Sequence, residues 1–280
     1  MNISLESCSA RHPSARDRSL PTLRELSLTV TSGEQLAIIG PSGAGKTTLL
    51  LMLACALKSS GGVLQINESK PWTLPAKGLT QLRGQLFLAP QVPPLPPRQR
   101  VVTAVLAGRL PHENLWASVR SLFYPTDIAL AELALAQFDM TGKLFERVDR
   151  LSGGERQRVG LARALASQAS LFLVDEPLSA LDPTRAEQAI ASLTTAARAR
   201  GATLVTTLHH VEMALRHFPR IIGLRGGSLA FDLPAAEVTP EHLHQLYDQH
   251  LDELTGTAPN AYDDSLTEPL VIQPVAMQCR

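Results

Sequence analysis

Short strand-like runs recur along this chain and predict a buried sheet. Gln35–Ile39 and Leu171–Val174 have the apolar composition of strands covered on both faces, and Ala202–Leu208 is a further strand-like run. Longer segments that are mostly free of Gly and Pro predict helices. These segments are Leu49–Leu57, Val101–Leu110, Ala129–Phe138 and Arg156–Ser167. Together the elements predict a mostly α/β fold with a parallel-sheet core and a helical insert.

The last part of the chain has a different composition. The strand pattern stops near Asp232, and Thr239–Leu254 predicts an amphipathic helix. From Thr255 to Arg280, Thr, Pro, Asn and Asp are frequent, which predicts a flexible tail.

A glycine-rich segment follows the first apolar strand and precedes a helix. In that context the pattern G-x-x-x-x-G-K-[ST], here Gly40, Gly45, Lys46 and Thr47, predicts a phosphate-binding loop. Backbone N–H groups and the helix N-terminus would bind phosphate oxygens, Lys46 would reach the β- and γ-phosphates, and Thr47 would bind Mg²⁺. An incidental lysine in a glycine-rich turn is the alternative, and the flanking strand and helix argue against it. The residues predicted to surround the nucleotide phosphates are Gly40, Pro41, Ser42, Gly43, Ala44, Gly45, Lys46, Thr47 and Thr48.

Two adjacent carboxylates end the second apolar strand. Asp175 and Glu176 follow Leu171–Val174, and Pro177 ends the strand. Parallel sheets bind ligands at the carboxyl ends of their strands. We therefore expect Asp175 to hold Mg²⁺, directly or through water, and Glu176 to act as general base toward an attacking water.

The segment LSGGE, residues 151–155, precedes the helix that Arg156 begins. Ser152 and Glu155 have the spacing of a capping box, which by itself indicates only a helix start. A helix start does not explain Gly153 and Gly154, which weaken the first turn by up to about 1 kcal/mol each relative to Ala. Close approach of a phosphate to the backbone would explain both glycines.

With these motifs in this order, the chain resembles the ATP-binding subunits of ABC transporters over roughly residues 3–235. The resemblance implies a P-loop NTPase fold of the ABC type, with a parallel core, an antiparallel β part and a helical subdomain at about residues 92–165. The ATP-binding domain would cover residues 1–235, and residues 236–280 would form a C-terminal helix and tail. It also implies a homodimer in which Ser152, Gly153 and Gly154 of one copy close over the ATP of the other.

The resemblance adds three further site residues. Gln91 matches the glutamine that contacts Mg²⁺ or the attacking water, Asp182 lies in the loop that crosses the dimer interface, and His209 matches the histidine that contacts the γ-phosphate. His210 is the neighbouring alternative, but the family histidine comes directly after the strand, which favours His209.

The chain departs from the family at its start, where residues 1–35 hold no aromatic residue to stack on adenine. His12 stands near that position as a stacking residue or a surface histidine, and we expect GTP to be hydrolysed almost as fast as ATP.

Two stretches resemble the phosphonate importer ATPases in particular. One runs from Leu208 through Ala214 to Leu224, and the other is the segment 105–110 followed by Trp116 and residues 121–123. They imply uptake of phosphonate or a related phosphorus oxyanion such as phosphite. The family partners are integral membrane permease subunits and, indirectly, a periplasmic or surface solute-binding protein.

A proline-rich run, residues 92–97, opens the helical subdomain as a stiff connector or a ligand for another domain. Arg98, Arg100 and Arg109 are candidates for the permease contact or ordinary solvated charges.

Composition limits the remaining possibilities. The formal net charge is zero, which argues against a nucleic-acid partner. Apolar runs fall short of the roughly 18 residues needed to cross a bilayer, and the N-terminal segment lacks a signal pattern. We therefore expect a peripheral protein on the cytoplasmic face of the cell membrane. Cys8, Cys55 and Cys279 are too widely spaced for a zinc motif and too few for a disulfide framework.

Several other functions share some of these motifs. An ABC ATPase of chromosome maintenance would need a long coiled coil between Lys46 and Ser152, and no heptads are sustained there. A non-transport ABC ATPase of phosphonate metabolism, an importer ATPase for another small solute and an exporter subunit remain as alternatives.

Overall fold

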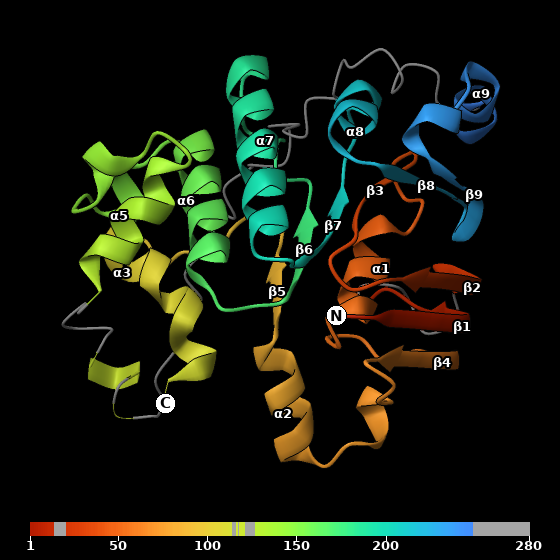
Figure 1. The fold of residues 1–280 in the computed structure, drawn as a ribbon, viewed down its shortest axis with the longest axis horizontal. Helices are drawn as coiled ribbons and strands as arrows, with labels where there is room; N and C mark the ends of the chain where they lie inside the picture. The colour runs from red at the N-terminus through yellow and green to blue at the C-terminus, as the bar shows by residue number, and fades with distance from the viewer. Residues whose placement is uncertain (14–20, 114–115, 117, 121–126, 249–280) are drawn as a thin grey trace, which may run out of the picture.

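The computed structural model describes residues 1–13, 21–113, 116, 118–120 and 127–248. The predicted flexible tail and the last residues of the predicted C-terminal helix lie outside these ranges. Figure 1 shows a central sheet with a group of helices on one side and a second, smaller sheet on the other.

The central sheet is mainly parallel. Its strands are β3 (Gln35–Ile39), β5 (Leu86–Ala89), β6 (Leu171–Asp175), β7 (Thr203–Thr207), β8 (Arg220–Arg225) and β9 (Ser228–Pro234), in the order β5-β6-β7-β3-β8-β9. Only β9 runs antiparallel to its neighbour. Every residue of β3, β6 and β7 is buried, which confirms the three strands predicted from the sequence.

Side chains of each central strand alternate between two hydrophobic clusters, so the sheet is the middle of three layers. On β3, Ala37 and Ile39 join the cluster that also contains the helices α6 (Gly153–Ala166), α7 (Pro183–Ala199) and α8 (Val211–His217). Leu36 and Ile38 join the cluster on the opposite face.

The opposite face is covered by helix α1 (Lys46–Leu53) and the antiparallel sheet of β1 (Ile3–Ala10), β2 (Leu23–Val30) and β4 (Gly61–Ile66), in the order β2-β1-β4. The prediction that this helix extends to Leu57 is wrong. Cys55 has a left-handed backbone with φ 53°, which a helix cannot continue through. Helix α2 (Ala76–Gly84) leads from this region into β5.

The helical part of the chain consists of α3 (Val101–Leu106), α5 (Ile128–Ala136) and α6, which pack together at one side of the molecule (Figure 1). The α-helix predicted over Val101–Leu110 ends early and continues as a 3₁₀ helix over Ala107–His112. Pro111 lies in this stretch and cannot supply the N–H that an α-helix needs. Further 3₁₀ turns occupy Pro71–Thr73, Thr141–Lys143, Val148–Arg150 and Ala235–Glu237.

The predicted C-terminal helix is described as α9 (Pro240–Tyr247), which starts with a capping box between Thr239 and His242. It lies beside α8 and the β8–β9 hairpin in Figure 1. None of the described helices has the length and apolar character that a bilayer crossing requires.

Candidate nucleotide site

The sheet register brings the predicted site residues to one edge. Val174 pairs with Ala89 on one side and Thr206 on the other, and Ile38 pairs with Thr207. The carboxyl ends of β5, β6, β7 and β3 therefore meet. Gln91, the Asp175–Glu176 pair, His209 and the phosphate loop each follow one of these four strand ends.

The phosphate loop turns tightly from β3 into α1, and two of its glycines have no room for a side chain. A Cβ on Gly40 would lie 2.0 Å from the Leu224 carbonyl oxygen, and one on Gly45 would lie 2.8 Å from Cδ2 of Leu23. Gly45 also has φ 103° as the N-cap of α1, a conformation that L-residues rarely adopt. Gly40 and Gly45 therefore have a steric cause in the fold, separate from the phosphate role that the sequence predicts for them.

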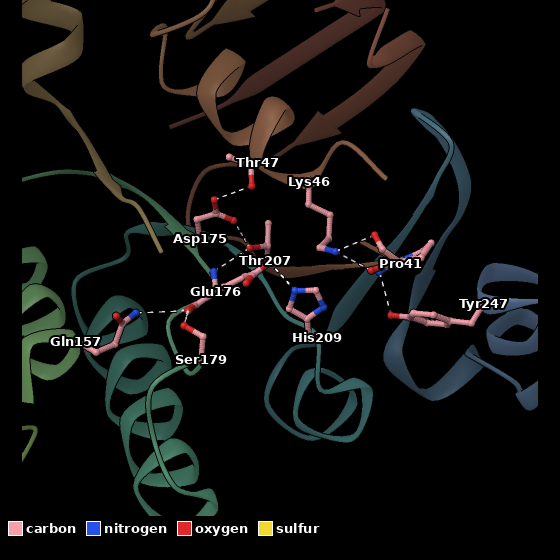
Figure 2. Close-up of polar contacts among 11 residues, drawn as sticks. Pro41, Lys46, Thr47, Gln157, Asp175, Glu176, Ser179, Thr207, His209 and Tyr247 are labelled. Atoms are coloured by element: carbon pink, nitrogen blue, oxygen red, sulfur yellow. Dashed lines mark hydrogen bonds and ion pairs between the residues drawn. The ribbon is translucent and has the colours of Figure 1, made fainter. Parts of the chain in front are cut away.

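Lys46 is buried and turned toward its own loop. Its Nζ donates to the carbonyl oxygens of Gly40 at 2.7 Å and Pro41 at 3.1 Å (Figure 2). Because a buried ammonium needs partners, these carbonyls satisfy the charge in the present conformation. Contact with a phosphate would require Lys46 to exchange them for phosphate oxygens.

Asp175 joins the phosphate loop to the centre of the sheet. Its Oδ2 accepts from the Thr47 hydroxyl at 2.8 Å, and its Oδ1 accepts from the Thr207 hydroxyl at 2.6 Å. The oxygen of Thr207 in turn accepts from the backbone N–H of Glu176 at 2.9 Å. One buried hydroxyl therefore orients both carboxylate residues.

Glu176 and His209 are hydrogen-bonded to each other. Nε2 of His209 lies 2.6 Å from Oε1 of Glu176 (Figure 2). Burial raises the pKa of Glu176, but the hydrogen bond and charge of His209, together with the charge of Lys46, outweigh it and leave the pKa below its ordinary value. Glu176 is also in the left-handed backbone region, with φ 46°. Such strain in a non-glycine residue is typical of functional sites.

The loop after Glu176 is tied to α6. The Glu176 carbonyl accepts from the Gln157 side chain at 3.4 Å and from the Ser179 hydroxyl at 3.3 Å. Gln157 is buried in the first turns of the helix that follows LSGGE. Helix α6 and the loop after Glu176 are therefore in direct contact within one chain.

The capping box predicted for Ser152 is present. The backbone N–H of Glu155 donates to Ser152 Oγ at 3.2 Å, and the backbone N–H of Ser152 donates to Glu155 Oε2 at 2.8 Å. This last hydrogen bond is the main cause that lowers the pKa of Glu155. The helix itself begins at Gly153.

The two glycines of the LSGGE segment, Gly153 and Gly154, are called the signature glycines below, and they have different surroundings. A Cβ on Gly154 would lie 2.7 Å from the Ala180 carbonyl oxygen, so this glycine is required by packing within the chain. A Cβ on Gly153 would meet nothing closer than the Ala180 Cβ at 3.9 Å. The fold therefore accounts for Gly154 and leaves Gly153 without an intramolecular reason.

The other predicted residues are less buried. Gln91, Ser152 and Asp182 are exposed. Asp182 caps α7 by accepting from the Arg185 backbone N–H at 3.0 Å. His12 is half-buried, and its backbone N–H donates to the Thr22 hydroxyl at 3.1 Å.

The position of His12 relative to the phosphate loop follows from Thr22. The Thr22 carbonyl would lie 3.2 Å from a Cβ on Gly45. Thr22, which directly precedes β2, therefore links the segment that contains His12 to the phosphate loop.

Two residues that contact the site, Thr207 and Tyr247, were not predicted from the sequence. Thr207 has a weak signal, because a polar residue at the end of a buried strand needs a partner. Tyr247 accepts a hydrogen bond from the Gly40 backbone N–H at 3.1 Å, and no local pattern marks it.

A mainly parallel sheet, a separate antiparallel sheet and a phosphate loop at the end of β3 together define a P-loop ATPase of the ABC type. A dimeric bacterial ABC transporter cassette superposes with a TM-score of 0.72 at 27% identity, over 83% of this chain and 98% of that chain. A cassette in a dimeric post-hydrolysis state bound to ADP and phosphate gives a TM-score of 0.71 at 26% identity, over the same shares of both chains.

Sequence relatives agree with the fold. The ABC transporter family profile matches residues 23–179. The phosphonates import ATP-binding proteins of Albidiferax ferrireducens and Polaromonas sp. are 72% and 69% identical over 280 residues, 100% of each chain. One from Pseudomonas aeruginosa is 50% identical over 247 residues, 88% of this chain and 91% of its own. The chain belongs to the ATP-binding proteins of the ABC transporter family.

Proposed function

We propose that this chain is the ATP-hydrolysing subunit of an importer that takes up phosphonate or a related phosphorus oxyanion. The convergence of Lys46, Asp175, Glu176 and His209 at one sheet edge carries the ATPase part of the proposal. The assignment of the cargo is supported by the relatives that match over 280 residues, which are phosphonates import ATP-binding proteins.

Magnesium fits the residues between the phosphate loop and β6. The Thr47 hydroxyl and the Asp175 carboxylate are oxygen donors 2.8 Å apart, and Mg²⁺ prefers oxygen ligands. Among the described residues there is no group of three or more His, Cys, Asp or Glu side chains arranged to hold a metal. Thr47 and Asp175 would therefore hold the ion together with phosphate oxygens and water, and we assign Gln91 to the same ion or to the attacking water. When bound, the ion neutralises charge on the phosphates.

In the proposed hydrolysis step, Glu176 after β6 and His209 after β7 act together. Glu176 accepts a proton from a water whose oxygen bonds to the γ-phosphorus, while the bond from that phosphorus to the bridging oxygen breaks and releases ADP and phosphate. A general base must be ionised to act, and His209 helps keep Glu176 so. His209 also contacts the γ-phosphate in this proposal. Lys46 and the loop N–H groups stabilise the phosphate charge.

The complete site requires two copies of the chain. Ser152 and Gly153 are exposed, and Ser152 exchanges hydrogen bonds with Glu155 of its own helix. We propose that Ser152, Gly153 and Gly154 bind the ATP held by the partner copy, with Asp182 at the interface. The similarity to dimeric cassettes supports this arrangement.

Closure of the dimer would move attached permease subunits on the cytoplasmic face of the membrane, and a solute-binding protein would deliver cargo on the other side. Two exposed apolar side chains within residues 92–165, Val92 at 79% and Trp116 at 86% exposure, are candidates for permease contact. Arg98 and Arg100 are exposed, whereas Arg109 donates to Asp127 at 2.5 Å within the chain.

Growth on a phosphonate as sole phosphorus source tests the proposal. Cells that lack the gene should fail to grow, and wild type should restore growth. Glu176→Gln should not restore it, whereas Glu212→Gln, which changes an exposed glutamate on α8, should. Growth on inorganic phosphate controls for general fitness. Normal growth of the deletion strain, in the absence of a second uptake system, would exclude the cargo and leave the ATPase assignment.

Dimer closure has its own test. Glu176→Gln should still bind ATP and should accumulate as a dimer with ATP and Mg²⁺, measured by light scattering after size-exclusion chromatography. A strictly monomeric variant under these conditions would contradict the two-copy site. Co-purification with membrane subunits would separate an importer from a non-transport ATPase of phosphonate metabolism.

A further inference from the structure

The last residue of α9 contacts the first residue of the phosphate loop. Tyr247 is buried, with 1% of its surface exposed, and its hydroxyl accepts from the Gly40 backbone N–H at 3.1 Å. The two residues are 207 positions apart in the chain. Figure 2 shows Tyr247 reaching the loop from the side opposite Asp175.

Gly40 needs this partner because it lies just beyond the strand ladder. The β3–β8 pairing ends at Ile39 and Gly223, and Gly40 is buried. A buried backbone N–H without an acceptor destabilises the conformation that buries it. The carbonyl of Gly40 accepts from Lys46 at 2.7 Å, so the residue is held by Tyr247 at its N–H and by Lys46 at its C=O.

Tyr247 is itself held in place by the β8–β9 hairpin and the core. The guanidinium of Arg225, the last residue of β8, donates to the carbonyl of Gln245 on α9. Leu246 is 1% exposed and belongs to the hydrophobic cluster that contains α6, α7 and α8. The turn of the same hairpin supports the loop a second time, since the N–H of Gly227 donates to the Ala44 carbonyl at 3.1 Å.

We propose that Tyr247 is a positioning residue of the phosphate loop. Its hydroxyl fixes the Gly40 peptide, and so sets where the loop N–H groups and Lys46 lie relative to the nucleotide phosphates. A loop that is ordered in advance binds its ligand with less loss of conformational freedom. The inference rests on the proposed ATP site, because it assigns to Tyr247 a role in the same loop.

Tyr247→Phe in the full-length chain removes the hydroxyl and keeps the ring in the core. We expect the KM for ATP to rise roughly three- to tenfold, as for the loss of one buried hydrogen bond, while kcat changes by less than about twofold. Arg225→Met, which releases the Gln245 carbonyl, should raise KM in the same direction and provides a second variant if Tyr247→Phe folds poorly.

Thr194→Val is the matched control. The Thr194 hydroxyl is buried and donates to the Ile190 carbonyl at 2.9 Å, and the Thr194 carbonyl accepts from Gln35 at the opposite end of β3. This variant should lower the melting temperature without a change in KM. If the Tyr247 hydroxyl had only a structural role, Tyr247→Phe and Thr194→Val would both lower the melting temperature, and neither would change the KM for ATP.

An unchanged KM in Tyr247→Phe, or an equal rise in Thr194→Val, would overturn the inference and leave the proposed function intact. Wild-type chain that bound no ATP would overturn the proposed function and this inference with it.

Discussion

Nε2 of His209 lies 2.6 Å from Oε1 of Glu176, and this hydrogen bond joins the end of β7 to the end of β6. The Glu176 side chain is 14% exposed and that of His209 is 39% exposed. His209, rather than its neighbour, is therefore the histidine that contacts the proposed general base, in agreement with the position expected from the strand end.

Substitution of the two adjacent histidines should separate their roles. We expect His209→Ala to lower the ATP hydrolysis rate by about 10² or more, because it removes the partner that orients Glu176. His210 is exposed at the N-cap of α8, and His210→Ala should keep the rate within about twofold of wild type. Steady-state phosphate release at saturating ATP measures both, and the opposite ranking would show that the wrong histidine was assigned.

Thr207 and Thr206 form a matched pair for the hydroxyl that orients both carboxylates. Thr207→Val should lower the free energy of unfolding by about 1–3 kcal/mol and reduce hydrolysis, because Asp175 and the Glu176 N–H lose a partner. Thr206 is equally buried, but its hydroxyl has no hydrogen-bond partner among the described residues. Thr206→Val should therefore be neutral or stabilising in denaturant unfolding. Similar effects of the two substitutions would contradict the bridging role.

The two signature glycines should respond differently to a methyl group. Gly154→Ala places its Cβ 2.7 Å from the Ala180 carbonyl and should lower the melting temperature. Gly153→Ala has space within the chain, so it should fold normally and lose hydrolysis only where two copies meet around ATP. Thermal melts and ATPase assays on both variants test this. A fully active Gly153→Ala would remove that residue from the proposed interface.

The lowered pKa of Glu176 predicts how stability depends on pH. Because the folded-state pKa lies below the ordinary value of 4.5, the ionised carboxylate favours the folded state above that pH. Its contribution should be lost as the pH falls through the lowered pKa. We expect the difference in unfolding free energy between wild type and Glu176→Gln to shrink below pH 4.5, measured without nucleotide. A difference that grows with acidification would contradict the assigned shift.

Base selectivity should be weak, because the segment near the phosphate loop offers His12 instead of a larger aromatic ring. GTP should be hydrolysed at a rate not far below that of ATP, and His12→Tyr should lower the KM for ATP. Parallel assays with both nucleotides test this. A strong preference of the wild type for ATP over GTP would contradict the prediction of weak base selectivity.

Sequence patterns predicted the elements whose cause is local. The strand before Gly40, the carboxylates after Val174 and the capping box at Ser152 each depend on neighbouring residues, and the structure contains all three. The early end of α1 had no such signal, because Cys55 takes a left-handed conformation without being a glycine. Thr207 and Tyr247 act on residues far away in the chain, through contacts that only the folded sheet creates.

The capping box at Ser152 also bears on how two copies would associate. A hydroxyl has one donor and two acceptor sites, and in the cap Ser152 Oγ accepts from the Glu155 N–H while its O–H interacts with the Glu155 carboxylate. In the proposed dimer, a phosphate oxygen of the ATP held by the partner copy would replace the Glu155 carboxylate as acceptor of this O–H, while the Glu155 N–H still caps the helix start. Since folding of each monomer already orders this segment, little conformational entropy remains to be lost there on association. The affinity of the closed dimer should then depend mainly on the contacts made across the interface.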